Sequence, residues 1–306
     1  MVLLVTAALI FAHVASRAAQ PAAADRPPII GIANVALRVS DLSAAKKFFE
    51  YTLGFDELPA NHQHNGQAGF LYFKVNDEQY IEISPTLQSP TEDRLIDIAF
   101  ETTNARRLRQ YLASRGVPIP ETVQKDADGN LSFSVKDPDG HTIEFVQYLP
   151  GSHEGRNRGK LLGSGRTSKQ IIHAGVTVQD RAEADRFYRD ILGFREMWHG
   201  GRTDDRTDWV DMQVPNGKNW LEYMLNVHNP TPRQLGVMHH LALGVESVKV
   251  VEAAVQERGE KPEEAHIGRD GKWQLNLYDP DFTRIEFMEF KPVRTPCCSP
   301  MRSAGN

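Results

Sequence analysis

The sequence lacks three features that would each mark a particular class of protein. Only two of its 306 residues are cysteines, and these neighbours, Cys297 and Cys298, lie near the C-terminus, where they cannot form a disulfide framework. A formal net charge of −5 leaves no basic excess for binding nucleic acid. No apolar run reaches the roughly 20 residues that a membrane-spanning helix needs. Disulfide-stapled, nucleic-acid-binding and membrane-spanning proteins are therefore not expected.

The N-terminal residues have the composition of a secretory signal. An apolar run over residues 2–14 is followed by small residues up to Ala24 that offer several cleavage sites. No Lys or Arg precedes the run, so a misassigned start and an uncleaved anchor are alternatives. We expect residues 1–24 to be a signal peptide and the mature chain to be periplasmic or secreted.

A pattern of strand, helix and three strands begins at Ile29. Its helix is capped by Asp41 and ended by Gly54, and the pattern restarts at Leu95 with a second helix over residues 105–114. Strand-like segments cover residues 32–39, 55–58, 69–75, 79–84, 95–100, 131–135 and 142–147. The first half of the chain thus predicts a strand-helix-three-strand unit, followed by a second unit of one strand, a helix and two further strands.

This whole unit occurs a second time. Asn34 and His173 are 139 residues apart, and Glu144 and Glu286 are 142 apart, each pair at corresponding places in the two halves. Such a match over more than a hundred residues indicates duplicated domains. The expected organisation is a first domain at 29–150, a Gly-, Ser- and base-rich linker at 151–169, a second domain at 170–292 and a disordered tail at 293–306.

Four potential metal ligands lie in strand-like segments of the second domain: His173, Glu222, His240 and Glu286. Alternate residues of a strand share a face, so four strands of one curved sheet can aim these side chains at a common point. Two imidazoles and two carboxylates suit a divalent transition metal such as Fe, Mn, Ni, Zn or Co. His239 would face the other side of its strand, and His240 is preferred because residues 240–243 align with residues 97–100.

The first domain carries different groups at the four corresponding positions: Asn34, Glu82, Asp97 and Glu144. No imidazole is present there. We therefore expect this domain to have lost its metal and to serve as a structural or binding partner. An all-oxygen site for a harder cation is the alternative.

Both halves resemble one protein family. The markers are Leu-Gly-Phe after the first helix, ending at Phe55 and Phe194, and an Asp-Pro-Asp turn, starting at Asp137 and Asp279, before a strand that carries Glu. With these markers the chain resembles the vicinal oxygen chelate superfamily, which includes glyoxalase I, bleomycin-resistance proteins and extradiol dioxygenases. The resemblance implies an α+β fold in which paired βαβββ modules form an eight-stranded, cup-shaped sheet around one metal. It is specific for the fold and not for the reaction.

Three functions are compatible with this resemblance. The His-Glu-His-Glu set is similar to the glyoxalase pattern and implies a metal-dependent lyase or isomerase acting on a small substrate with vicinal oxygens, with Glu286 or Glu222 as the base. The first alternative is an extradiol dioxygenase with Fe or Mn held by His173, His240 and Glu286. Against it, neither the tyrosine nor the second histidine that the family has near its ring-cleavage site falls in place, since Tyr278 lies directly before Asp279-Pro280, and a carboxylate at Glu222 is unexpected. The second alternative is a non-catalytic small-molecule binding or resistance protein.

Export argues against a glutathione thioester as substrate, and a monomer or a homodimer is expected.

Other residues complete the expected site. His266 is a candidate acid-base residue. A polar set could hold an anionic substrate group or be solvated charges of an Asp/Arg-rich loop: His199, Arg202 and Arg206. Residues in phase with the ligands would line the cup: Thr177, Trp220, Met224, Ala242 and Met288.

Overall fold

The computed structural model describes residues 25–59 and 69–302 of the chain. The expected signal peptide, residues 1–24, lies outside the described residues. Within the two described ranges, no helix combines the length and the apolar character needed to cross a bilayer.

The first domain consists of two βαβββ modules, as the family resemblance implies, and the short strand β6 is one that the sequence pattern does not predict. α2 and β8 begin and end at the predicted residues. The first module contains β1 (Ile29–Arg38), α1 (Leu42–Lys47), the π-helical segment η1 (Phe48–Thr52), β2 (Asp56–Leu58), β3 (Leu71–Lys74) and β4 (Tyr80–Ser84). The second contains β5 (Leu95–Thr102), α2 (Ala105–Ser114), β6 (Gln124–Lys125), β7 (Leu131–Lys136) and β8 (Thr142–Gln147). A short helix, α3 (His153–Arg156), follows in the segment between the domains.

The second domain repeats this order and adds one helix, α5, before its fifth strand. Its first module contains β9 (Ile171–Val178), α4 (Arg181–Asp185), the π-helical segment η2 (Arg186–Ile191), β10 (Arg195–Gly200), β11 (Trp209–Gln213) and β12 (Trp220–Leu225). After it come α5 (Pro232–Met238), β13 (His240–Val245), α6 (Val248–Glu257), β14 (His266–Ile267), β15 (Trp273–Tyr278) and β16 (Arg284–Glu289).

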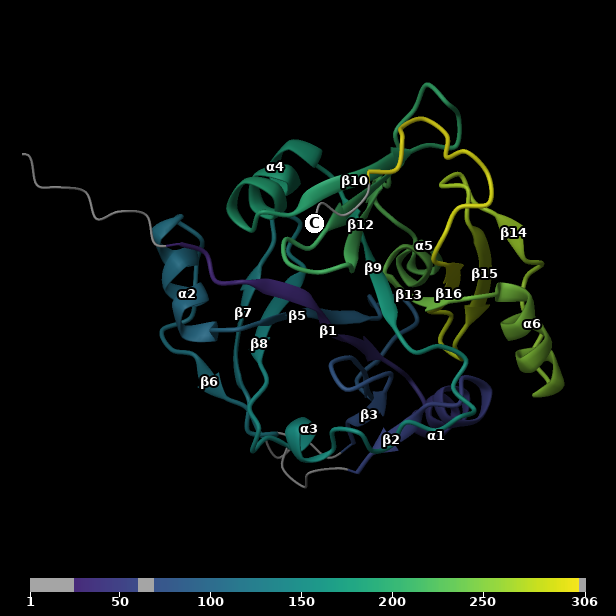
Figure 1. Cartoon of the computed structure of the whole chain (residues 1–306), viewed down its shortest axis with the longest axis horizontal. Helices are drawn as coiled ribbons and strands as arrows, with labels where there is room; N and C mark the ends of the chain where they lie inside the picture. The colour runs from purple at the N-terminus through teal and green to yellow at the C-terminus, as the bar shows by residue number, and fades with distance from the viewer. Residues whose placement is uncertain (1–24, 60–68, 303–306) are drawn as a thin grey trace, which may run out of the picture.

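Each domain folds into one eight-stranded mixed sheet (Figure 1). The strand order is β2-β3-β4-β1-β5-β8-β7-β6 in the first and β10-β11-β12-β9-β13-β16-β15-β14 in the second. β9 and β13 pair antiparallel at the centre of the second sheet, and each has a parallel partner outside it, β12 and β16. The first and last strands of the two modules therefore lie side by side, which is the arrangement that can gather ligands.

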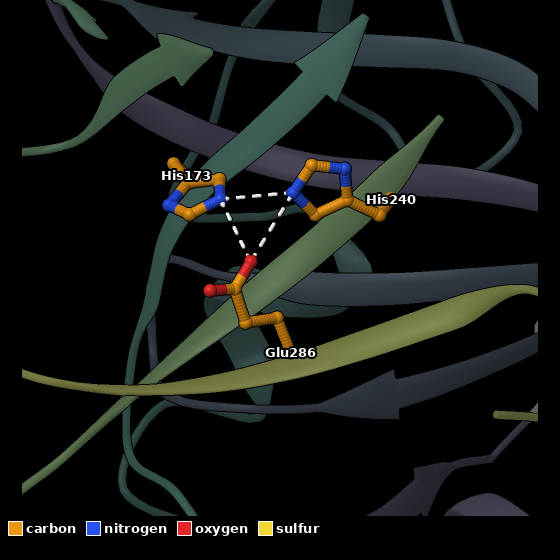
Figure 2. Close-up of side chains that lie close together, drawn as sticks. All are labelled: His173, His240 and Glu286. Atoms are coloured by element: carbon orange, nitrogen blue, oxygen red, sulfur yellow. Dashed lines mark hydrogen bonds and ion pairs between the residues drawn. The ribbon is translucent and has the colours of Figure 1, made fainter. Parts of the chain in front are cut away.

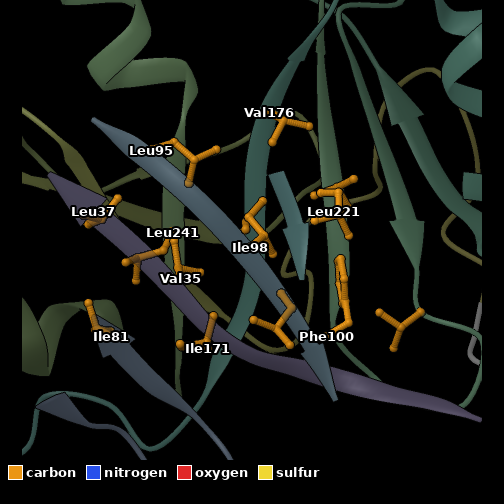
Figure 3. Close-up of a cluster of buried hydrophobic side chains, with 14 of the residues drawn as sticks. Val35, Leu37, Ile81, Leu95, Ile98, Phe100, Ile171, Val176, Leu221 and Leu241 are labelled. Carbon is orange, nitrogen blue, oxygen red and sulfur yellow. The ribbon is translucent and has the colours of Figure 1, made fainter. Parts of the chain in front are cut away.

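The two sheets bury their apolar faces in one shared core. Side chains from both domains, among them Ile98 and Phe100 on β5 and Val176 on β9, belong to the same buried cluster (Figure 3). Alternation along each strand therefore directs one set of residues to this core and the other set to the concave face.

Two buried amides join the first strands of the domains. Gln79 donates to the carbonyls of Ile32 and Ile171, at 3.1 and 2.9 Å, and accepts from the N–H of Ile171 at 2.9 Å. Asn219, from the second domain, donates to Ile171 O at 2.7 Å and accepts from Ile32 N at 3.1 Å. These bonds satisfy backbone groups that the β1–β9 contact would otherwise leave buried and unpaired.

The C-terminal segment lies against the second domain, where the sequence predicts a disordered tail. It follows β16 and runs to β10, as the yellow loop in Figure 1 shows. Its backbone is held at both ends, because Val293 N donates to Gly271 O at 2.8 Å and Arg302 N donates to Met197 O at 2.8 Å. Between them, Trp198 Nε1 donates to the carbonyl of Cys297 at 3.1 Å, and Cys297 is disulfide-bonded to Cys298.

Candidate metal centre

Three side chains from three adjacent strands meet on the concave face of the second domain (Figure 2). They are His173 on β9, His240 on β13 and Glu286 on β16, all buried. The two imidazole Nε2 atoms lie 3.0 Å apart, and Glu286 Oε2 lies 3.6 Å from that of His173 and 3.4 Å from that of His240. Neighbouring ligands of an ion with bonds of roughly 2.1 Å have separations of this size.

Glu222, the fourth expected ligand, approaches the same point from β12. Its Oε2 lies 3.3 Å from Nε2 of His240 and 3.8 Å from Nε2 of His173. The tight group with all ligand atoms within 4.8 Å of one another consists of the other three. The structure thus brings all four sequence-predicted residues together. Glu222 lies beside the tighter set formed by the two histidines and Glu286.

A glycine on the neighbouring strand makes room for His240. Gly175 faces His240 across the β9–β13 ladder. A Cβ atom at residue 175 would overlap with the imidazole ring of His240 and come within 2.9 Å of Met238 O. Gly175 is therefore required for the close approach of the ring to β9, a role that its place in the sequence does not reveal.

Hydrogen bonding leaves a ligand atom of His240 directed at the centre. Its Nδ1 is 2.9 Å from the carbonyl of Met238, which can only accept, so Nδ1 carries the hydrogen and the Nε2 lone pair faces the site. His173 packs against the ring of Trp220, with centroids 5.0 Å apart, and its buried Nδ1 has no hydrogen-bond partner among the described residues. Two imidazole nitrogens beside two carboxylates fit a divalent transition metal.

The charges of the cluster also suit a cation. Burial alone would raise the pKa of Glu286, but Arg284 and the two histidines hold it well below its usual range. Burial likewise raises the pKa of Glu222, and His240 and His173 lower it by more. Burial lowers the pKa of His173. The two carboxylates and His173 thus favour the protonation states that metal binding requires. Burial and Arg284 lower the pKa of His240, but Glu222 and Glu286 raise it above its ordinary value overall, so His240 must give up a proton that is held more tightly than usual when it binds a metal.

The cluster opens into a cavity of about 370 Å³. Its walls include two tryptophans, Trp198 and Trp209, and Met288. Four ionisable residues that sequence reasoning did not single out also line it: Asp211, Arg269, Asp270 and Arg284. Arg284 could have been found, because it lies two residues before Glu286 and so on the same face of β16. Asp211 could not, because its place opposite Glu222 depends on the register of β11 with β12.

The surroundings of Asp211 favour its neutral form. Its side chain is buried, and burial followed by the charge of Glu222 raises its pKa well above the ordinary range. A protonated Asp211 would add no negative charge beside Glu222.

Only some of the residues predicted to line the cup are found in the wall of the cavity. Met288 lines the cavity, whereas Trp220 and Ala242 pack with Met288 in a small buried cluster beneath it. Thr177 instead opens onto a different cavity of about 380 Å³, where its hydroxyl lies 2.9 Å from His239 Nε2. His239 points away from the metal centre, with its Nδ1 2.8 Å from Asp93 of the first domain.

The candidate polar residues divide into two groups. His266 lines the cavity, as an acid-base role requires. His199, by contrast, pairs with Glu196 at 2.7 Å, and Arg202 and Arg206 pair with Asp208 at 3.2 and 2.7 Å. The two arginines are thus engaged within their own loop.

The equivalent positions of the first domain hold carboxyl and amide groups. Buried oxygens of Asn34 and Asp97 have no hydrogen-bond partner among the described residues. Burial, followed by the charges of Glu144 and Glu82, raises the pKa of Asp97 well above its ordinary value. The raised pKa reflects repulsion among these carboxyls, which a proton relieves. The imidazoles that would hold a transition metal are absent from these four positions.

Comparisons with known proteins agree with this architecture. The sequence profile of the Glyoxalase/Bleomycin resistance protein/Dioxygenase superfamily matches residues 31–145 and 170–287, one match in each domain and together more than half of the chain. The chain belongs to this superfamily. Virulence protein STM3117 of Salmonella typhimurium, strain LT2, is 31% identical to it over 123 residues, which are 39% of this chain and 84% of that protein.

Solved structures with this superfamily fold include extradiol dioxygenases. Catechol 2,3-dioxygenase aligns with a TM-score of 0.65 and 16% identity, over 90% of this chain and 92% of its own. A variant of homoprotocatechuate 2,3-dioxygenase from B. fuscum aligns with a TM-score of 0.63 and 19% identity, over 87% of this chain and 72% of its own. LapB, a 2,3-dioxygenase from Pseudomonas sp. KL28, aligns with a TM-score of 0.62 and 15% identity, over 88% of this chain and 98% of its own. At identities of 15 to 19%, the similarity to these structures shows a shared fold and nothing more.

Proposed function

We propose that the protein is a metal-dependent enzyme of the glyoxalase-like lyase or isomerase type, acting on a small substrate with vicinal oxygens in the cup of the second domain. The observation that carries this proposal is the position of Glu222. A carboxylate 3.3 Å from His240 Nε2, on the cavity side of the histidines, is placed both to complete a four-residue ligand set and to exchange a proton with a substrate.

Each residue has a defined part in the proposed reaction. His173, His240 and Glu286 would hold the metal, which supplies Lewis-acid polarisation of two adjacent substrate oxygens. Glu222, ionised because the histidines lower its pKa, would accept a proton from the substrate carbon next to those oxygens and return it to the neighbouring carbon. Asp211 lies opposite Glu222 on the ladder, and because burial and the charge of Glu222 favour its neutral form, it would add no charge that raises the basicity of Glu222 further. Glu286 is the second candidate base.

Extradiol ring cleavage is the second candidate function. It is favoured by the tight group of His173, His240 and Glu286, two histidines and one carboxylate, which suits Fe or Mn with open positions. The two-domain match to catechol 2,3-dioxygenase and the presence of His266 in the cavity wall support it as well. The hydroxyl of Tyr278 donates to Glu263 at 3.1 Å, and Tyr278 is not among the residues lining the cavity, so the tyrosine of that chemistry has no counterpart there.

Metal content and substrate-dependent exchange test the proposal. Mature protein purified without chelators is analysed for metals beside His240→Ala and Glu222→Gln. We expect about one divalent ion per chain, lost in His240→Ala. Glu222→Gln is expected to keep most of the metal but to lose about 10²- to 10⁴-fold of the turnover, because the metal set of three remains while the base is gone.

The two chemistries give different readouts. Proton exchange from D2O into α-hydroxycarbonyl compounds or hemithioacetals, without O2 uptake, supports the lyase or isomerase. Catechol-dependent O2 uptake with Fe or Mn supports the dioxygenase. If the protein binds no metal even after reconstitution, the enzyme proposal fails and a non-catalytic binding protein takes its place.

We also propose that the mature chain is exported, which rests on the composition of residues 1–24. Cell fractionation and N-terminal sequencing of the mature protein test this. A cytoplasmic chain that begins at Met1 would contradict it.

A further inference from the structure

Arg284 stands between the candidate metal centre and the cavity. It lies on β16 two residues before Glu286, so both side chains project from the same face of the strand. Its Nη2 atom is 2.8 Å from Nε2 of His240 and 3.8 Å from Oε2 of Glu286. Its Nε is buried and has no hydrogen-bond partner among the described residues, although the side chain lines the cavity.

Arg284 and a metal would compete for one atom of His240. Because Nδ1 of His240 donates to Met238 O, the single free lone pair of the ring is on Nε2. That lone pair can accept an N–H of Arg284 or bind a metal, but it cannot do both. A guanidinium is always charged and also repels a divalent cation at this distance. Metal binding therefore requires the contact between Arg284 and His240 to break.

Once Arg284 loses its contact with His240, one edge of its guanidinium is free to donate two hydrogen bonds. Nε–H and Nη2–H project from the same side of the guanidinium and form the fork that binds planar oxyanions with two parallel bonds. Nε–H has no partner in the described protein, and Nη2–H would have lost its acceptor to the metal. The other arginine of the cavity wall, Arg269, is already engaged with Gly201 O and Asp204. Asp270 is paired with Lys272 at 3.4 Å.

We propose that Arg284 is the carboxylate-binding residue of this site: when the metal is bound, its Nε–H/Nη2–H edge holds the carboxylate of an anionic substrate. This inference rests on the proposed metal site and names the substrate class for it, a small carboxylate-bearing molecule. The tryptophans Trp198 and Trp209 in the walls provide faces for a flat, apolar body. Binding of carboxylate and of metal is then cooperative, because the carboxylate keeps Arg284 away from His240.

Calorimetric titration with Mn²⁺ tests the cooperativity, with benzoate as the carboxylate probe and benzamide as its neutral match. In the wild type we expect benzoate to tighten Mn²⁺ binding about tenfold or more, the scale of a charge-assisted bidentate contact, and benzamide to leave it unchanged. In Arg284→Met, Mn²⁺ should bind several-fold more tightly on its own, and the effect of benzoate should vanish. Arg284→Lys retains the charge without the fork and should show a reduced effect.

Arg189→Met is the matched control, because Arg189 is half-exposed and pairs with Asp185 and Asp190 on the helical side of the domain. It should behave as the wild type. If benzoate tightens Mn²⁺ binding equally in Arg284→Met, benzoate reaches the metal without Arg284 and the inference is overturned while the metal site stands. If the wild type does not bind Mn²⁺ or any other divalent ion, the proposed function fails and the inference with it. If Arg284→Met does not fold, as judged by its thermal transition, an undiminished benzoate effect in Arg284→Lys overturns the inference in the same way.

Discussion

Asp137 and Asp279 occupy equivalent turns but differ in their partners, and this difference predicts opposite effects for the same substitution. Oδ1 of Asp279 accepts backbone N–H bonds from Asp281 and Thr283 at 3.0 and 2.7 Å, but its buried Oδ2 has no hydrogen-bond partner among the described residues. In the first domain, Oδ2 of Asp137 pairs with Nδ1 of His141 at 2.8 Å and accepts from the hydroxyl of Tyr188 at 2.9 Å.

Burial raises the pKa of Asp279 from 3.8 to about 7. Because the folded pKa is above the unfolded one, folding holds the proton more tightly, and stability is lost as pH rises from about 4 through about 7. The difference corresponds to about 4 kcal/mol once both states are ionised. Asn keeps the accepting oxygen without the charge. Asp279→Asn should therefore be more stable than the wild type by up to about 4 kcal/mol at pH 8 and nearly equal to it at pH 4.

Asp137→Asn is the matched control, since it removes the charge-assisted bonds to His141 and Tyr188. It should destabilise the protein by about 1.5 to 3 kcal/mol at pH 7. Urea unfolding of the three proteins at pH 4.5, 6, 7 and 8 measures both effects. The reasoning is refuted if the stability difference between Asp279→Asn and the wild type does not grow with pH, or if both substitutions destabilise the protein equally at pH 8.

Three further predictions concern the site and its supports. Gly175→Ala should weaken metal binding without removing a ligand, because its Cβ would overlap with the ring of His240; metal titration measures this, and unchanged affinity would contradict it. Gln79→Ala should cost about 2 to 4 kcal/mol in urea unfolding, since three buried hydrogen bonds are lost, two of them between the domains, and a change under 1 kcal/mol would count against that account. Removing residues 292–306 should lower substrate affinity more than metal affinity, because Trp198 in the cavity wall loses its bond to Cys297; equal loss of both affinities would argue for general unfolding instead.

Local patterns were sufficient for much of the fold. The period-2 alternation around His173, Glu222, His240 and Glu286 assigns each to the concave face of its strand, because side-chain direction follows from the backbone geometry of a strand alone. The repeated unit in turn indicates which strands correspond. The cap at Asp41 confirms this local character, since its carboxylate accepts from Ser43 N and Ala44 N at the start of α1 as predicted.

Features that depend on partners distant in the sequence could not be predicted from local patterns. Thr177 is in phase with His173, yet it faces His239 and the neighbouring cavity, because β9 extends past the cup to the first domain. The order of the tail up to Arg302 depends on backbone bonds to Met197 and Gly271, which lie far away along the chain.

The sequence by itself determined the duplicated βαβββ architecture and the identities of four competent ligands, since periodicity and repetition are properties of the chain. The tertiary structure decided what surrounds those ligands. Strand register places Gly175 under His240 and Asp211 opposite Glu222, and it lets Arg284 share the Nε2 atom of His240. Register and sheet curvature are set by the collective packing of both domains into one core, so these contacts have no signature in any single stretch of sequence.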